Sequence, residues 1–78
     1  TLIANARRLE ALGYDTLWIP EVFGREPVAT CAYLLACTER MRIGSGILNV
    51  YARDAHAAAQ AGNTLAEMSG GRFTLGLG

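Results

Sequence analysis

The chain has 78 residues, of which 51% are hydrophobic, and its seven basic and seven acidic side chains give a net charge of zero. A neutral chain lacks the basic surface that nucleic acids and anionic membranes attract, so we expect neither as a partner. Its apolar runs are shorter than the roughly 20 residues of a membrane span, which also argues against a membrane protein.

The chain opens with a helical pattern over residues 2–12, in which apolar side chains recur on one face. Gly13 follows as the left-handed residue that ends many helices. Residues 16–19 then predict a strand that ends at Pro20, because proline cannot donate to a strand ladder. Glu21 follows the carboxyl end of this strand, where it is either a solvated loop acid or a functional group.

A second helix is predicted over residues 28–37, with Pro27 well placed for its first turn. The preceding pair Arg25-Glu26 is interpreted as solvated loop charges. Cys31 and Cys37 are six residues apart and point to different faces of this helix, so we expect no disulfide between them. Two thiols without metal-ligand spacing favour ordinary core packing, no metal site and a cytoplasmic location.

The central feature of the sequence is the stretch from Arg42 to Asn49, which reads as a buried strand that becomes glycine-rich at its exit. Glycines inside a strand usually mark a bulge or a close approach to the backbone. In parallel α/β proteins, ligands bind at the carboxyl ends of strands. Gly44, Gly46 and Asn49 are therefore candidates for a binding site.

A third helix is predicted from residue 55 to about 68, with Asp54 as its N-cap. His56, in its first turn, is interpreted as a surface histidine rather than a proton acceptor. Residues 73–78 alternate bulky and small side chains with the period of a strand, and Gly76 lies on the small side.

The predicted strands begin near Leu17, Ile43 and Phe73, which is a βα rhythm of 26 and 30 residues. This pattern predicts an α/β fold with parallel strands and right-handed crossovers. Three such units are few for a parallel sheet, which needs both faces covered. We therefore expect residues 1–78 to be part of a larger domain.

Three stretches resemble one known family: residues 9–21 with Leu17-Trp18-Ile19-Pro20-Glu21, residues 38–47, and residues 64–78 with Ser69-Gly70-Gly71-Arg72-Phe73. They are similar to the luciferase-like monooxygenase superfamily, in its branch that uses the deazaflavin coenzyme F420. The resemblance implies a partial TIM (β/α)8 barrel, with parallel strands two to four and the helices between them. Strand one and strands five to eight of the single domain would lie outside residues 1–78.

The resemblance further implies an oxidoreductase in which a bound flavin-type ring transfers hydride to or from a small organic substrate. The candidate cofactor-binding residues are Glu21, Ser45, Gly46, Ile47 and Asn49. The family also implies a cis peptide bond between Gly46 and Ile47, at a bulge that lies against the ring. The complete protein is expected to be a homo-oligomer, whereas this piece alone is expected to be inactive.

Two departures from the family pattern bear on the site. Some deazaflavin enzymes have a histidine after the strand-two acid, but this chain has Val22 there, so no catalytic residue is assigned. The loop before the third helix reads Arg53-Asp54-Ala55, where the family usually has a proline in third place.

Alternative functions remain open at this point. The cofactor could be flavin mononucleotide (FMN), in a monooxygenase of the same superfamily. Gly76-Leu77-Gly78 could instead be the start of a Rossmann-type nucleotide loop cut at Gly78. A truncated product without activity is the non-enzyme alternative.

Overall fold

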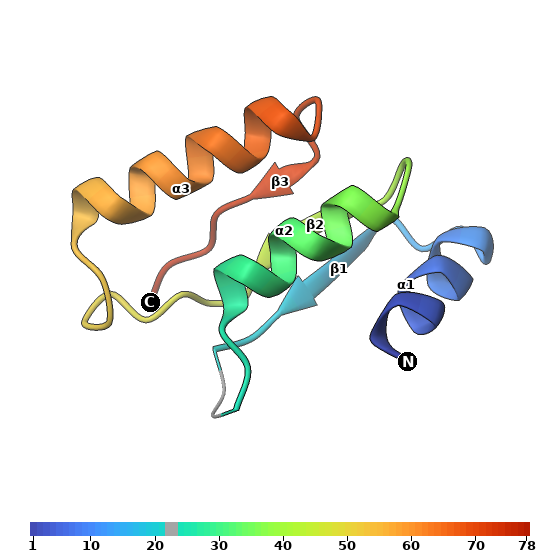
Figure 1. Cartoon of the computed structure of the whole chain (residues 1–78), viewed down its shortest axis with the longest axis horizontal. Coiled ribbons are helices and arrows are strands. Elements are labelled where there is room, and N and C mark those ends of the chain that lie inside the picture. Colours follow the sequence, from blue (N-terminus) through green and yellow to red (C-terminus); the bar gives the residue numbers. More distant parts are fainter. Residues whose placement is uncertain (22–23) are drawn as a thin grey trace.

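Helices and strands alternate along the whole chain (Figure 1). The computed structural model describes residues 1–21 and 24–78, so Val22, on which one departure from the family rests, lies outside the described residues. The elements, in chain order, are α1 (Leu2–Ala11), β1 (Thr16–Ile19), α2 (Pro27–Cys37), β2 (Arg42–Ser45), α3 (Ala55–Met68) and β3 (Phe73–Thr74).

The three strands form one parallel sheet in the order β1-β2-β3. Leu17 pairs with Ile43, and Ile43 pairs with Phe73. These are the three residues near which the sequence rhythm starts its strands, so the prediction of a parallel α/β sheet is confirmed.

The predicted helix ends are also observed. Pro27 occupies the first turn of α2, and the Asp54 side chain accepts a hydrogen bond from the Ala57 amide at 2.7 Å as the N-cap of α3. Gly13 has a φ of 90° and ends α1. The amides of Gly13 and Tyr14 donate to the carbonyls of Glu10 and Leu9, which is the double-bonded helix end in which glycine is favoured.

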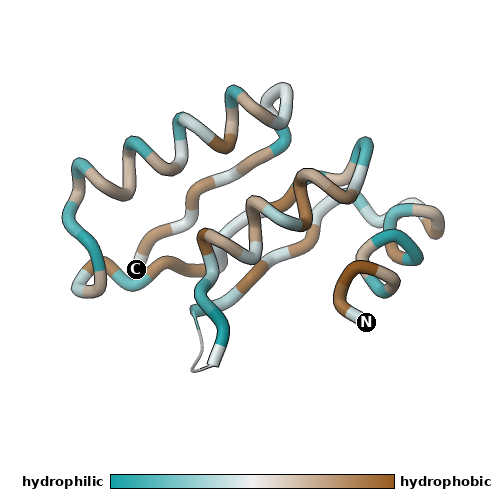
Figure 2. Tube along the Cα trace, viewed as in Figure 1, coloured by the Kyte–Doolittle hydropathy of each residue, from teal (hydrophilic) through white to brown (hydrophobic). Residues whose placement is uncertain are grey.

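Helices cover one face of the sheet, which gives a two-layer structure only 16 Å thick along its shortest axis. In Figure 1, α2 lies over β1 and β2, α3 lies beside β3, and α1 packs at the outer side of α2. The core between the layers includes Ile19, Leu34, Ile43 and Phe73. Figure 2 shows the corresponding hydrophobic positions along α2 and the strands, with hydrophilic residues at many of the turns.

The opposite face of the sheet is open. The Trp18 side chain lies on this face over Gly44, because a Cβ built on Gly44 would fall 2.5 Å from the indole ring. Trp18 is 54% exposed although it sits in a strand. In a closed barrel, this face would line the interior.

The last strand is shorter than predicted. Regular pairing of β3 with β2 ends at Thr74, and the segments that follow these two strands pair again at an isolated bridge between Leu48 and Leu77. Between these points the Ser45 hydroxyl exchanges hydrogen bonds of 2.9 Å with the amide and the carbonyl of Gly76. A Cβ on Gly76 would overlap the Ser45 carbonyl oxygen, so this close approach of the two segments requires glycine there.

Two charged side chains fasten the amino edge of the sheet. The Glu10 carboxylate accepts hydrogen bonds from the amides of Glu39, Arg40 and Met41 at 2.6–3.2 Å. These bonds, led by those from Arg40 and Met41, lower the pKa of Glu10 from 4.5 to about 2.

The second of these side chains is Arg72. Its guanidinium donates at 2.8–3.3 Å to the carbonyl of Leu35, in the last turn of α2, and to those of Thr38 and Met41, which follow the helix. Five donors in one planar fork allow a single arginine to make these contacts.

Candidate functional site

A hollow of about 430 Å³ opens at the carboxyl edge of the sheet, where ligands bind in parallel α/β proteins. Its lining comes from the segment after β1, the segment and loop after β2, and Gly78. The lining residues are Pro20, Glu21, Gly46, Ile47, Asn49, Tyr51 and Gly78. Four of the five predicted cofactor-binding residues are therefore brought together here.

Ile47 is the apolar surface of this hollow. Its side chain is 47% exposed, and it lies against Gly78, where a Cβ would overlap the isoleucine. The peptide bond between Gly46 and Ile47 is cis, as the family resemblance implies. Glycine at 78 thus leaves space for the Ile47 side chain at this edge of the sheet.

Glu21 is held by a dense set of contacts. Its Oε1 accepts from the Asn49 amide at 2.6 Å and from Arg53 at 2.9 Å, and its Oε2 accepts from Arg53 at 3.2 Å. The Arg53 contact first, and then the Asn49 amide, hold the pKa of Glu21 below its usual value. Glu21 is therefore a carboxylate that braces the loop after β2, not a solvated acid.

The loop after β2 is fixed from two sides. The Asn49 amide donates to Glu21, while the Asn49 side-chain Oδ1 accepts from the Tyr51 amide at 2.8 Å. Tyr51 itself is 95% exposed. Asn49 lines the hollow from a loop whose backbone is held by these two contacts.

Ser45 is the predicted site residue that the structure does not bring to the hollow. It is 1% exposed, and its hydroxyl bonds with Gly76 across the sheet. That packing accounts for the glycine at 76 without a nucleotide-binding loop.

Arg53 and Glu26 are the residues that sequence reasoning missed. Glu26 was predicted to pair with Arg25 in solvent, but it pairs with Arg53 at 2.9 Å and also caps α2 through the Ala29 amide. A signal was present in the sequence. Glu21, Glu26 and Arg53 all follow strands, so parallel topology places opposite charges at one edge of the sheet.

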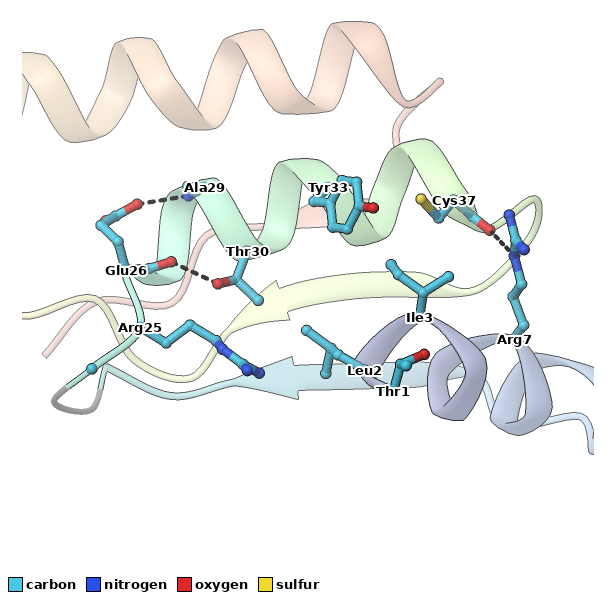
Figure 3. A pocket seen from close by; sticks show the side chains of 11 residues that line it. Thr1, Leu2, Ile3, Arg7, Arg25, Glu26, Ala29, Thr30, Tyr33 and Cys37 are labelled. Carbon is cyan, nitrogen blue, oxygen red and sulfur yellow. Dashed lines mark hydrogen bonds between the residues drawn. The ribbon is translucent and has the colours of Figure 1, made fainter.

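A hollow larger than the one at Ile47 lies elsewhere in the described part of the chain, between the start of α1 and α2 (Figure 3). Its volume is about 840 Å³, and it shares no lining residue with the hollow at Ile47. Figure 3 shows Arg25, Tyr33 and Leu2 around it, with Arg7 bonded to the Cys37 carbonyl at its far end. It lies on the helix-covered side and holds none of the predicted site residues.

Other kinds of site find no support in the described part of the chain. Residues 1–21 and 24–78 contain no group of three or more His, Cys, Asp or Glu side chains that could hold a metal ion. Among those residues, no helix is long and apolar enough to cross a membrane. His56 is exposed at the start of α3, as interpreted from the sequence.

The fold and the position of the hollow define part of a TIM barrel with a candidate ligand site at the carboxyl ends of its strands. The family model "Luciferase-like monooxygenase" matches residues 1–78. This chain therefore belongs to the luciferase-like monooxygenase family.

Individual relatives are consistent with this family. A candidate coenzyme F420-dependent oxidoreductase of Mycobacterium tuberculosis is 38% identical over 69 residues, which is 88% of this chain and 20% of the relative. The 5,10-methylenetetrahydromethanopterin reductase of Methanolobus tindarius is 36% identical over 74 residues, which is 94% of this chain and 23% of the relative.

Among solved structures, the coenzyme F420-dependent tetrahydromethanopterin reductase of Methanopyrus kandleri superposes with a TM-score of 0.86 at 27% identity. The superposition covers 97% of this chain and 22% of that one. The chain thus spans about a fifth to a quarter of the length of these relatives, and its fold is part of their TIM barrel.

Proposed function

We propose that this chain is part of an F420-dependent oxidoreductase and that the hollow at Ile47 receives the deazaflavin ring. The observation that carries the proposal is the half-exposed Ile47 side chain between Gly46 and Gly78, at the carboxyl edge of a parallel sheet. The relatives named for coenzyme F420 support the choice of cofactor.

The residues present fit such a ring. A planar aromatic ligand needs a flat apolar support and a few polar groups at one side. Ile47 supplies the support, and glycine at 78 makes its position possible, because a Cβ there would overlap the Ile47 side chain. The Asn49 amide group supplies a polar partner at the rim, while Glu21 keeps the Asn49 backbone in place.

When bound, coenzyme F420 supplies two-electron hydride chemistry. The described residues would hold and orient its ring, with Ile47 as the apolar support and Asn49 as a polar partner. Neither Glu21 nor His56 is assigned a proton transfer, since the first is committed to Arg53 and the second is exposed at a helix start.

We further propose that β1, β2 and β3 correspond to strands two to four of one barrel, with the remaining strands supplied by the complete protein. The open edges of β1 and β3 and the uncovered face around Trp18 support this assignment. The complete enzyme would act on a small organic substrate as a cytoplasmic homo-oligomer.

The test is a fluorescence titration of the complete protein with coenzyme F420 and with FMN. We expect tighter binding of F420, and an Ile47→Ala variant that binds it about tenfold more weakly because the apolar support is lost. Val50→Ala is the matched control, since Val50 is also 47% exposed in the same loop but does not line the hollow. Equal or reversed affinities for F420 and FMN would reject the deazaflavin assignment in favour of an FMN enzyme.

A further inference from the structure

Arg53 joins three segments at the carboxyl edge of the sheet. It comes from the loop between β2 and α3, and its side chain is only 17% exposed. One edge of its guanidinium donates to both carboxylate oxygens of Glu21, which follows β1, at 2.9 and 3.2 Å. Its NH2 group also contacts Glu26, the N-cap of α2, at 2.9 Å.

The contact with Glu21 has the geometry in which arginine is most selective. Two parallel N–H donors facing one carboxylate fix both the distance and the orientation of the acid. Glu21 then uses the oxygen it shares with Arg53 to accept from the Asn49 amide at 2.6 Å. The position of Asn49 therefore depends on Arg53 through Glu21.

Arg53 itself does not line the hollow, whereas Glu21 and Asn49 do. Without Arg53, two carboxylates at this edge would face each other with no cation between them among the described contacts. Their repulsion would release Glu21 from the orientation in which it holds Asn49.

We propose that Arg53 is a positioning residue for the ring site: it sets the place of Glu21 and thereby of Asn49 at the rim of the hollow. This inference rests on the proposed function, because the ligand whose binding reports it is the deazaflavin ring. It adds a residue that acts through a neighbour and does not itself contact the ring.

The experiment measures the dissociation constant of coenzyme F420 for variants of the complete protein. Arg53→Met is expected to weaken binding about 10–100-fold. Arg53→Lys should recover only part of the loss, since an ammonium group cannot meet both carboxylate oxygens in a planar fork. Arg40→Met is the matched control, because Arg40 has a 72% exposed side chain and its ion-pair partner is Glu39 at 3.8 Å. The Arg40→Met variant should bind F420 as tightly as the unmodified protein does.

A double-mutant cycle separates positioning from a general effect on stability. If Arg53 acts through Glu21, then adding Arg53→Met to Glu21→Gln causes no further loss of F420 affinity. Losses that multiply in the double variant, or an Arg53→Met protein that binds F420 as tightly as Arg40→Met, would overturn the inference. Failure of the unmodified protein to bind F420 would instead reject the proposed function, so the two failures are distinguishable.

Discussion

Replacing Glu10 by glutamine removes the charge from a carboxylate that accepts three backbone amides at the turn before β2. The pKa of Glu10 is lowered from 4.5 to about 2, and that difference corresponds to roughly 3 kcal/mol at 1.36 kcal/mol for each pKa unit. Because Glu10 is partly exposed, solvent screening reduces the expected contribution to about 1–2 kcal/mol.

The sign of the pH dependence follows from the direction of the shift. A carboxyl whose pKa is lower in the folded state stabilises the fold above its unfolded pKa, and this contribution is lost as the pH falls. For Glu10 the loss runs from about pH 4.5 down to about pH 2. The stability difference between the unmodified protein and Glu10→Gln should therefore be complete at pH 7 and shrink below pH 4.5.

The assay is urea unfolding of the complete protein at pH 7 and at several values below 4.5. Glu39→Gln is the matched control, because it removes the same charge from an 85% exposed side chain whose ion-pair partner, Arg40, lies 3.8 Å away. We expect a change near zero for Glu39→Gln. Equal losses for the two variants, or a Glu10→Gln loss that does not depend on pH, would refute the reasoning.

Two further predictions concern packing and thiol chemistry. Gly76→Ala should destabilise the complete protein by about 1–3 kcal/mol, because the added Cβ overlaps the Ser45 carbonyl. Gly46→Ala is the control, since a Cβ at that position meets only ordinary contacts at 3.4 Å. Similar melting temperatures for the two variants would contradict this prediction. Burial raises the pKa of the fully buried Cys31 thiol to about 11. An aromatic disulfide reagent at pH 8 should therefore label Cys37 well before Cys31. Equal labelling of the two cysteines in the native protein, measured by mass spectrometry, would count against this prediction.

The features that the sequence predicted well depend on local patterns. The strand starts at Leu17, Ile43 and Phe73 follow from apolar runs between helical segments, and they pair in register. Pro27 and Asp54 mark helix starts because their preferences act within one turn of the chain. The cis bond before Ile47 came from family resemblance, not from any local rule.

The features that were missed depend on contacts between residues far apart in the chain. Glu21 and Arg53 are 32 residues apart, and Ser45 and Gly76 are 31 apart. Periodicity places such residues at one edge of a sheet, but it does not predict which charges form ion pairs or which hydroxyl forms hydrogen bonds with the backbone. The end of β3 was missed for the same reason. Its regular pairing with β2 stops where Ser45, on the neighbouring strand, bonds with Gly76.

The contacts of Arg72 also order the events of folding during synthesis. A ribosome releases α2 well before Arg72, which follows Leu35 by 37 residues. Until Arg72 emerges, the Leu35 carbonyl in the last turn of α2 lacks the guanidinium donor that it has in the folded protein. The nascent helix would therefore fray at that end, and α2 becomes fully fastened only when the start of β3 docks beside β2. Arg72 thus completes both the end of α2 and the start of β3. We therefore expect these two elements to reach their folded positions together and not one after the other.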